Sequence, residues 1–203
     1  SQDGGYTWKI VHSPKEKNDY HNHRIIIDNQ NPDIIYQSVG DWRHHGILKS
    51  KDGGDSWTKV ISGIHPTGAL QFDDYILWSL DNYPSPGIAW HDKKTDTIES
   101  IYHLPEPFGG SGYYMAEGNG KIYVPFISYA SEDIYWPGSI FISENGGRTW
   151  EPFAILDKRY SEGVGFYKFV TDQKYGYLYA SRVISDKTGA RRPYLGTIRF
   201  PLK

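Results

Sequence analysis

Carboxylate side chains that could cleave a glycosidic bond lie in polar segments of this 203-residue chain, and the candidates are Asp41, Glu132 and Asp133. Such cleavage needs two carboxyl groups flanking the bond, ~5 Å apart when the sugar configuration is retained and ~6.5–9.5 Å apart when it is inverted. The sequence supplies the acids but not their separation. The competing interpretation of each is a solvated loop charge.

Aromatic and cationic side chains accompany these acids. Sugar rings stack on Trp and Tyr, hydroxyl groups need polar partners, and a guanidinium binds a carboxylate through two hydrogen bonds. The candidate substrate-binding residues are Trp42, Arg43, His44, Tyr83, Tyr135, Trp136, Arg159, Arg182 and Arg192. The alternatives are aromatic loop anchors and surface ion pairs. A polysaccharide lyase with His or Tyr as its base would use the same residue types.

Histidine spacing gives little support for a metal site. His21 and His23 could face the same way on an extended segment, whereas the adjacent His44 and His45 point to opposite sides. No carboxylate lies at a matching distance, so we expect no metal and no cofactor. The chain has no cysteine, which excludes disulfides and thiolate zinc sites.

One eight-residue phrase occurs three times, at residues 1–8, 50–57 and 143–150, with the pattern Ser-x-Asp/Asn-Gly-Gly-x-Ser/Thr-Trp. It is therefore an internal repeat. The glycines supply positive φ for a tight hairpin turn, and the Asp or Asn oxygen can accept backbone N–H bonds inside it. We expect the Trp ring to fold under the turn and bury a large apolar area.

These residues resemble the Asp-box, or BNR repeat, of sialidases, xyloglucan-cleaving glycosidases, sortilin-type receptors and a photosystem assembly factor. In those families the box joins the third and fourth strands of a β-propeller blade. The resemblance therefore implies an all-β propeller of four-stranded antiparallel blades. It transfers no catalytic residue, because the Arg-Ile-Pro segment and the tyrosine nucleophile of sialidases have no match in this sequence.

The spacing of the boxes indicates blades of ~40–50 residues. The first two are 49 residues apart and the next two 93, and a worn copy is expected near residue 95, in the segment Trp90–Ile98. Sixteen strands, enough for four blades, are predicted at 7–11, 24–28, 34–39, 46–50, 56–61, 69–72, 75–80, 87–91, 97–102, 112–117, 121–128, 139–143, 149–156, 165–171, 177–183 and 195–200.

Residues 1–203 are then a single propeller domain or the C-terminal portion of one. The N-terminal strand, Thr7–Val11, could complete the last sheet and close a four-bladed ring, which would remove an open sheet edge. The alternative is part of a six- or seven-bladed ring, with the remaining blades supplied by the same precursor.

The placement of the candidate residues predicts what the chain does. Connections between second and third strands, and between blades, share the propeller face opposite the boxes. Most of the candidate residues and seven of the eight histidines fall there. We therefore expect a carbohydrate-binding propeller for a poly- or oligosaccharide, with glycoside hydrolase-like or lyase activity. The alternative is a non-catalytic glycan- or protein-binding propeller, such as a receptor, an adhesin or an assembly factor.

Composition excludes other classes of partner. The net charge of −2 argues against nucleic acid, and no apolar run approaches the length of a membrane span. The absence of cysteine does not decide the compartment. An extracellular, cell-surface or virion-surface location is the favoured one.

Overall fold

The structure, a computed structural model, describes residues 1, 3–10, 21–40, 45–82, 85–127, 129–130, 135–136, 138–156, 164–172, 174, 176–185 and 191–202. Within these ranges there is no helix, and all regular structure is antiparallel β-sheet. The strands form three sheets of four, one sheet of three and a two-stranded hairpin. The predicted all-β class is confirmed.

The first two sheets are formed by strands in chain order. The first contains β1 (His21–Ile27), β2 (Ile35–Gly40), β3 (Gly46–Ser50) and β4 (Thr58–Ser62). The second contains β5 (Pro66–Gln71), β6 (Tyr75–Leu80), β7 (Gly87–Asp92) and β8 (Thr97–His103). Two of these strands, β3 and β6, have the predicted bounds. Their ends were predictable because glycine or polar turn residues flank both strands.

The third sheet contains β9 (Ala116–Gly118), β10 (Lys121–Phe126), β13 (Gly138–Ser143) and β14 (Glu151–Leu156). A hairpin that the sequence did not predict, β11 (Tyr129–Ala130) with β12 (Tyr135–Trp136), lies between β10 and β13. The fourth sheet contains β15 (Val164–Asp172), β16 (Tyr177–Ser185) and β17 (Arg191–Pro201).

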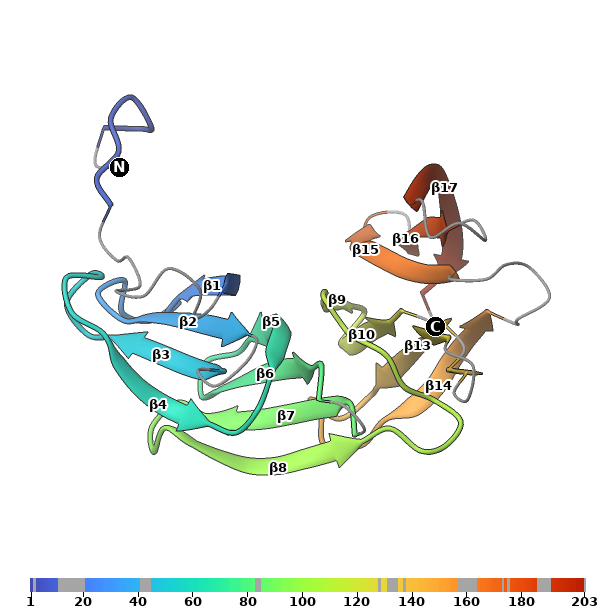
Figure 1. Cartoon of the computed structure of the whole chain (residues 1–203), viewed down its shortest axis with the longest axis horizontal. Helices are drawn as coiled ribbons and strands as arrows, with labels where there is room; N and C mark the ends of the chain where they lie inside the picture. The colour runs from blue at the N-terminus through green and yellow to red at the C-terminus, as the bar shows by residue number, and fades with distance from the viewer. Residues whose placement is uncertain are drawn as a thin grey trace.

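The four sheets follow one another around an open arc (Figure 1). The first strand of each sheet (β1, β5, β9 and β15) lies toward the inside of the arc, and β4, β8 and β14 lie toward the outside (Figure 1). The N-terminal turn and β17 lie at opposite tips (Figure 1). The predicted strand 7–11 is wrong for residues 7–10, which form no strand. None of the described strands lies alongside residues 7–10 to form backbone hydrogen bonds with them.

Apolar side chains fill the spaces between neighbouring sheets. Strand β6 shows how: Ile76 and Trp78 pack toward the first sheet, against Tyr36 and Ile47, whereas Leu77 packs toward the third sheet, against Phe141. Successive residues of a strand face opposite sides, so an unbroken apolar run serves a sheet that is covered on both faces. A third cluster joins the third and fourth sheets.

The repeated turn has the same internal hydrogen bonds in all three copies. In the second copy Gly54 N donates to Ser50 Oγ (2.8 Å), Ser56 N donates to Asp52 Oδ1 (2.8 Å), and Trp57 Nε1 donates to Gly54 O (2.9 Å). The corresponding bonds of the other two copies are 2.7–3.0 Å long. The predicted turn chemistry is confirmed, including positive φ at both glycines of every copy.

The turns differ in what their tryptophans contact. Trp150 is 7% exposed between the second and third sheets, Trp57 is half-buried, and Trp8 is 80% exposed. The predicted burial is therefore right for Trp150 and wrong for Trp8, because burial needs a neighbouring sheet. The expected worn copy is the turn after β7, where the Asp92 carboxylate accepts from the amides of Lys94 and Thr95.

Candidate functional site

The antiparallel topology sorts the connections onto two faces. Neighbouring strands run in opposite directions, so the connections between second and third strands, and between sheets, leave the same end of every sheet. We call this end the upper face. The turns after first and third strands, including the repeated turns at 50–57 and 143–150, lie at the opposite end, the lower face.

The predicted site residues belong mainly to upper-face connections. Eight lie outside the described residues: Asp41, Trp42, Arg43, His44, Tyr83, Glu132, Asp133 and Arg159. The backbone of the other four is described: Tyr135 and Trp136 pair with Ala130 and Tyr129 in the hairpin, Arg182 pairs with Gly196, and Arg192 pairs with Ile184. Their roles stay predictions.

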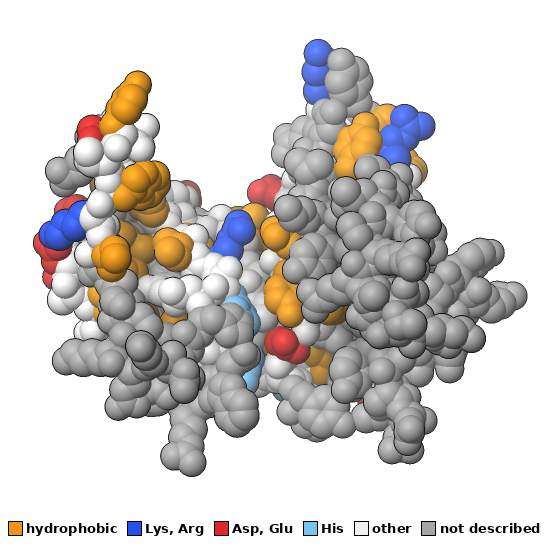
Figure 2. Space-filling model, turned by 45° about the horizontal axis from the view of Figure 1, so that its top comes forward, with side chains coloured by type: hydrophobic (Ala, Val, Ile, Leu, Met, Phe, Trp, Pro, Cys, Tyr) orange, Lys and Arg blue, Asp and Glu red, His pale blue; other side chains and the backbone are white. Residues whose placement is uncertain are grey.

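A hollow of about 260 Å3 opens at the upper end of the inner strands. The described residues that line it come from three segments, namely β1, β5 and the stretch before β9, and they are His23, Arg24, Thr67, Tyr113 and Tyr114. Figure 2 shows a hollowed surface along the inside of the arc, with histidine, basic and acidic side chains beside it. The predicted set contains none of these five residues.

A β-bulge explains how two adjacent residues of β1 line the same hollow. Neighbours on a regular strand point to opposite faces. The register of β1 against β2 shifts between Asn22 and Arg24, so His23 is an extra residue and the bulge re-aims its neighbours. The His23 ring lies against Gly40, where an added Cβ would be 2.4 Å from the ring. Strand β5 has a similar shift around Thr67.

Small residues hold the tyrosine segment against the second sheet. The carbonyl of Gly112 accepts hydrogen bonds from Thr67 Oγ1 and Ser79 Oγ, and Gly68 N donates to Ser79 Oγ (2.9 Å). A Cβ at Gly68 would lie only 2.6 Å from the carbonyl carbon of Tyr113. These contacts fix the backbone that presents Tyr113 and Tyr114 to the hollow.

Two further histidines meet on the upper face, beside the hollow's β5 wall. The rings of His45 and His65 stack with their centroids 3.9 Å apart. The connection is held by Asn82 Oδ1, which accepts from His65 N (2.7 Å), and by His65 O, which accepts from Asp81 N (2.8 Å). The loops β2–β3, β4–β5 and β6–β7 therefore converge, as the predicted upper face requires.

The hollow is lined by aromatic, cationic and hydroxyl-bearing side chains. Two phenol rings supply flat apolar faces, Arg24 supplies a permanent cation, and the described lining contains no carboxylate. Stacking and polar recognition are available there, whereas an acid–base pair would have to come from other residues of the upper face. Among the described side chains no three His, Asp or Glu residues are grouped as metal ligands.

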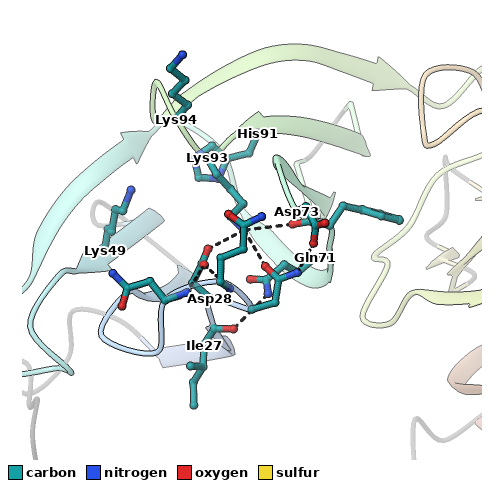
Figure 3. A network of polar contacts seen from close by, with 12 residues as sticks. Ile27, Asp28, Lys49, Gln71, Asp73, His91, Lys93 and Lys94 are labelled. Atoms are coloured by element: carbon teal, nitrogen blue, oxygen red, sulfur yellow. Dashed lines mark hydrogen bonds and ion pairs between the residues drawn. The ribbon is translucent and has the colours of Figure 1, made fainter.

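A separate polar network lies on the lower face, where the first two sheets meet (Figure 3). Lys93 Nζ is 2.7 Å from Asp28 Oδ2 and donates to Asn29 Oδ1 (3.0 Å) and Phe72 O (3.2 Å). Burial raises the pKa of Asp28, but hydrogen bonds from Lys93 and two backbone amides outweigh it, so the pKa lies below its ordinary value. Asp28 and Lys93 are paired with each other, and Lys93 also bonds to Asn29 and Phe72, so these contacts join the first sheet to the second.

His91 is buried in the same sheet junction (Figure 3). Trp78 Nε1 donates to its Nδ1 (3.3 Å), which leaves the proton on Nε2, 3.7 Å from Asp96. Lys49 pairs with that carboxylate at 2.8 Å. Burial lowers the pKa of His91 to about 4, and the Asp96 charge only partly opposes the shift. His91 is also the one histidine that was predicted to lie outside the upper-face connections.

Sequence reasoning missed Arg24, Tyr113 and Tyr114. It assigned Arg24 to the start of a regular strand and residues 112–117 to another strand. Because the site candidates were sought mainly in loops, these side chains were not included. The available signal was the run Gly109-Gly110-Ser111-Gly112 before two tyrosines, which marks a close backbone approach. Only the packed sheets show that β1, β5 and this segment meet.

Comparison with known proteins identifies the fold. No protein-family model and no curated protein matches the sequence. The GH74 enzyme from Niastella koreensis is 17% identical with a TM-score of 0.63, over 90% of this chain and 32% of that one. YCF48 from Cyanidioschyzon merolae is 16% identical with a TM-score of 0.56, over 94% of this chain and 60% of that one.

The extracellular domain of a one-component system from B. thetaiotaomicron is 12% identical with a TM-score of 0.54, over 92% of this chain and 22% of that one. This chain therefore spans less than two thirds of each of these structures. Similarity at such identities shows the fold alone, and that fold is a β-propeller. The described residues contain no helix able to span a bilayer.

Proposed function

We propose that this chain is a carbohydrate-binding Asp-box propeller whose upper face processes a poly- or oligosaccharide, by hydrolysis or by elimination. The observation that carries the proposal is the hollow of about 260 Å3 on that face, where Tyr113 and Tyr114 lie beside His23 and Arg24. Tyrosine rings can stack on the C–H face of a sugar, while Arg, His and hydroxyl groups can bind its oxygens.

The repeated turns support the Asp-box part of the proposal. The copies at 50–57 and 143–150 join neighbouring strands, and their serine, aspartate and asparagine side chains accept hydrogen bonds from the turn's own amides, so their role in this proposal is structural. The similarity of the fold to that of the GH74 enzyme supports the catalytic part of the proposal only in one respect: a propeller of this kind can carry an enzyme's active site.

The catalytic part of the proposal rests on the predicted upper-face residues. Asp41, Glu132 and Asp133 are the proposed acid–base candidates for glycosidic cleavage. Stacking and polar contacts beyond the hollow are assigned to Trp42, Arg43, His44, Tyr83, Tyr135, Trp136, Arg159, Arg182 and Arg192. Their positions along the chain, in or next to the connections predicted for the upper face, support this assignment.

Binding to a panel of oligosaccharides, measured by calorimetry, tests the proposal. We expect Tyr113→Ala and Tyr114→Ala to weaken binding at least tenfold, since loss of a stacking ring costs on the order of 1 kcal/mol or more. The matched control is Tyr6→Ala, because Tyr6 is 92% exposed and belongs to the N-terminal turn at one tip of the arc (Figure 1). A protein that retains no sugar from the panel would rule the proposal out.

A second function, non-catalytic glycan binding, is favoured by one observation: the described lining of the hollow has no carboxylate. The two functions differ in their products. Hydrolysis releases reducing ends, and elimination releases an unsaturated sugar that absorbs ultraviolet light. If Asp41→Asn, Glu132→Gln and Asp133→Asn all leave sugar binding intact and the parent protein releases neither product, the binding module is the correct function.

A further inference from the structure

We propose that the hollow on the upper face selects an anionic sugar, with Arg24 binding its carboxylate or sulfate group. The inference rests on the proposed sugar-binding function and names the ligand class of that same site. It is carried by the charge of the hollow, by the bulge that aims Arg24 into it, and by the size of the space.

Arg24 is the only permanently charged residue among the described residues that line the hollow. Arg24 forms no ion pair and no side-chain hydrogen bond with any described residue. By contrast Lys49, Lys93, Lys121 and Arg148 all pair with carboxylates. In a chain whose net charge is −2, an unpaired guanidinium at a concave site has its donors available for an anion.

The backbone holds Arg24 in a fixed place at the hollow. Its strand is paired with β2, where Arg24 lies opposite Ser38, and Ser38 Oγ donates to Arg24 O (3.5 Å). The bulge at His23 directs both residues to one side of the strand. Little conformational freedom of the main chain is then lost when a ligand binds, which favours recognition by a preorganised site.

The size and the walls of the hollow fit one ring rather than a long chain. About 260 Å3 is slightly less than the ~300–1,000 Å3 of sites for drug-sized molecules. Tyr113 and Tyr114 offer ring faces for stacking, and Arg24 is the charged partner that orients the ring. A neutral sugar supplies no counter-charge to the guanidinium, whereas a carboxylate or sulfate can accept two hydrogen bonds from it, so the anionic sugar is preferred.

The test compares three oligosaccharides of equal length by calorimetry: oligogalacturonate, which carries carboxylates, a sulfated galactan oligomer, and a neutral galactan oligomer. We expect at least one anionic oligomer to bind at least tenfold more tightly than the neutral one at low salt, with the advantage falling as salt rises. The carboxylate and sulfate arms identify which anion is recognised.

Arg24→Gln is expected to bring the anionic oligomers to the affinity of the neutral one, and Arg24→Lys to restore only part of the preference, because Lys lacks the bidentate fork. The matched control is Lys51→Gln, which removes the same charge from an exposed site on the lower face. Thermal melts of all three variants check that each is folded.

The outcomes separate the inference from the proposed function. Equal affinity for neutral and anionic oligomers, lost in Tyr113→Ala, overturns the inference and leaves sugar binding intact. An anionic preference that survives Arg24→Gln, or that Lys51→Gln abolishes equally, also overturns it. Absence of binding to every oligomer overturns the proposed function and the inference with it.

Discussion

Within each repeated turn, one serine hydroxyl accepts a hydrogen bond from the backbone N–H of the second glycine. How far this bond is buried decides how much it contributes to the free energy of unfolding. In the third copy Ser143 is buried and accepts from the buried Gly147 N (2.9 Å). We predict that Ser143→Ala lowers the free energy of unfolding by about 1–3 kcal/mol, since the amide loses its acceptor away from water. Urea denaturation followed by tryptophan fluorescence measures the change.

The first copy of the turn supplies the control for this prediction. Ser1 Oγ accepts from Gly5 N (2.7 Å) in the same geometry, but both residues are exposed. Water replaces the hydroxyl there, so Ser1→Ala should leave the unfolding free energy nearly unchanged. Equal effects of the two substitutions would contradict the claim that burial decides the contribution.

Protonation of His91 is expected to destabilise the protein at mildly acidic pH. Its folded pKa of about 4 lies below the ordinary 6.5, so the unfolded chain binds the proton more readily between these values. The stability is therefore complete above pH 6.5 and is lost as pH falls toward 4, by on the order of 3 kcal/mol. Urea denaturation at pH 4.5, 5.5 and 7 measures it.

The groups around His91 allow a matched variant. Trp78, Tyr36, Lys49, Asp92 and Asp96 all face the ring or contribute to its charge environment. His91→Asn keeps an acceptor for the indole but cannot titrate, so its stability should change less over this range. Carboxylates with lowered pKa, such as Asp28, lose their contribution only as pH falls below 3.8. A variant as pH-sensitive as the parent would refute the assignment.

At the scale of elements, close contact between β5 and the Gly109–Tyr114 segment places the tyrosines. We predict that Gly68→Ala destabilises the protein by about 1–3 kcal/mol and weakens sugar binding, because the new Cβ collides with Tyr113 and Ser79. Denaturation and calorimetry measure the two effects. They should occur together, since the same displacement causes both.

Gly120→Ala is the control for Gly68→Ala. Gly120 has φ of +71° in the turn between β9 and β10, and a Cβ there would meet nothing within 4 Å. Its substitution costs backbone strain of about 1 kcal/mol without moving Tyr113. If Gly120→Ala weakens sugar binding as much as Gly68→Ala, lost stability rather than displaced tyrosines is the cause.

At the scale of the whole molecule, the Asp28–Lys93 pair couples the first sheet to the second. The two side chains are only 4% and 8% exposed. Lys93→Met should lower the unfolding free energy by about 3–5 kcal/mol, because it leaves a buried carboxylate unpaired. The double variant Asp28→Asn with Lys93→Met should recover part of that loss. A double variant less stable than Lys93→Met would show that the pairing is not the cause.

The open arc gives a second prediction at this scale. Trp8 is 80% exposed at one tip, whereas the equivalent Trp150 is buried between sheets. Trp8→Phe should therefore reduce the red-shifted, readily quenched part of the tryptophan emission. If the N-terminal segment instead packs on the fourth sheet as a closing strand, acrylamide quenching would find Trp8 shielded and the substitution would remove blue-shifted emission.

Local chemistry explains how much of the fold could be predicted. The short apolar runs, the glycine pairs and the Asp, Asn and Ser side chains act over a few residues, so the strands β3 and β6 and the turns were predictable. The prediction of a strand at 7–11 is wrong for residues 7–10, because a strand needs a partner strand that the local sequence does not specify. The bulges at His23 and Thr67 were not predictable either, since a register shift depends on the opposing strand.

The amino-acid sequence by itself determined an all-β chain of repeated strand–turn units. It also predicted that most of the candidate site residues lie in the connections of the upper face. Only the tertiary structure decided which residues line a common hollow. His23, Arg24, Thr67, Tyr113 and Tyr114 are separated by up to about ninety residues and meet because β1, β5 and the segment before β9 all lie inside the arc. Such proximity is set by the packing of whole sheets, which no local pattern encodes.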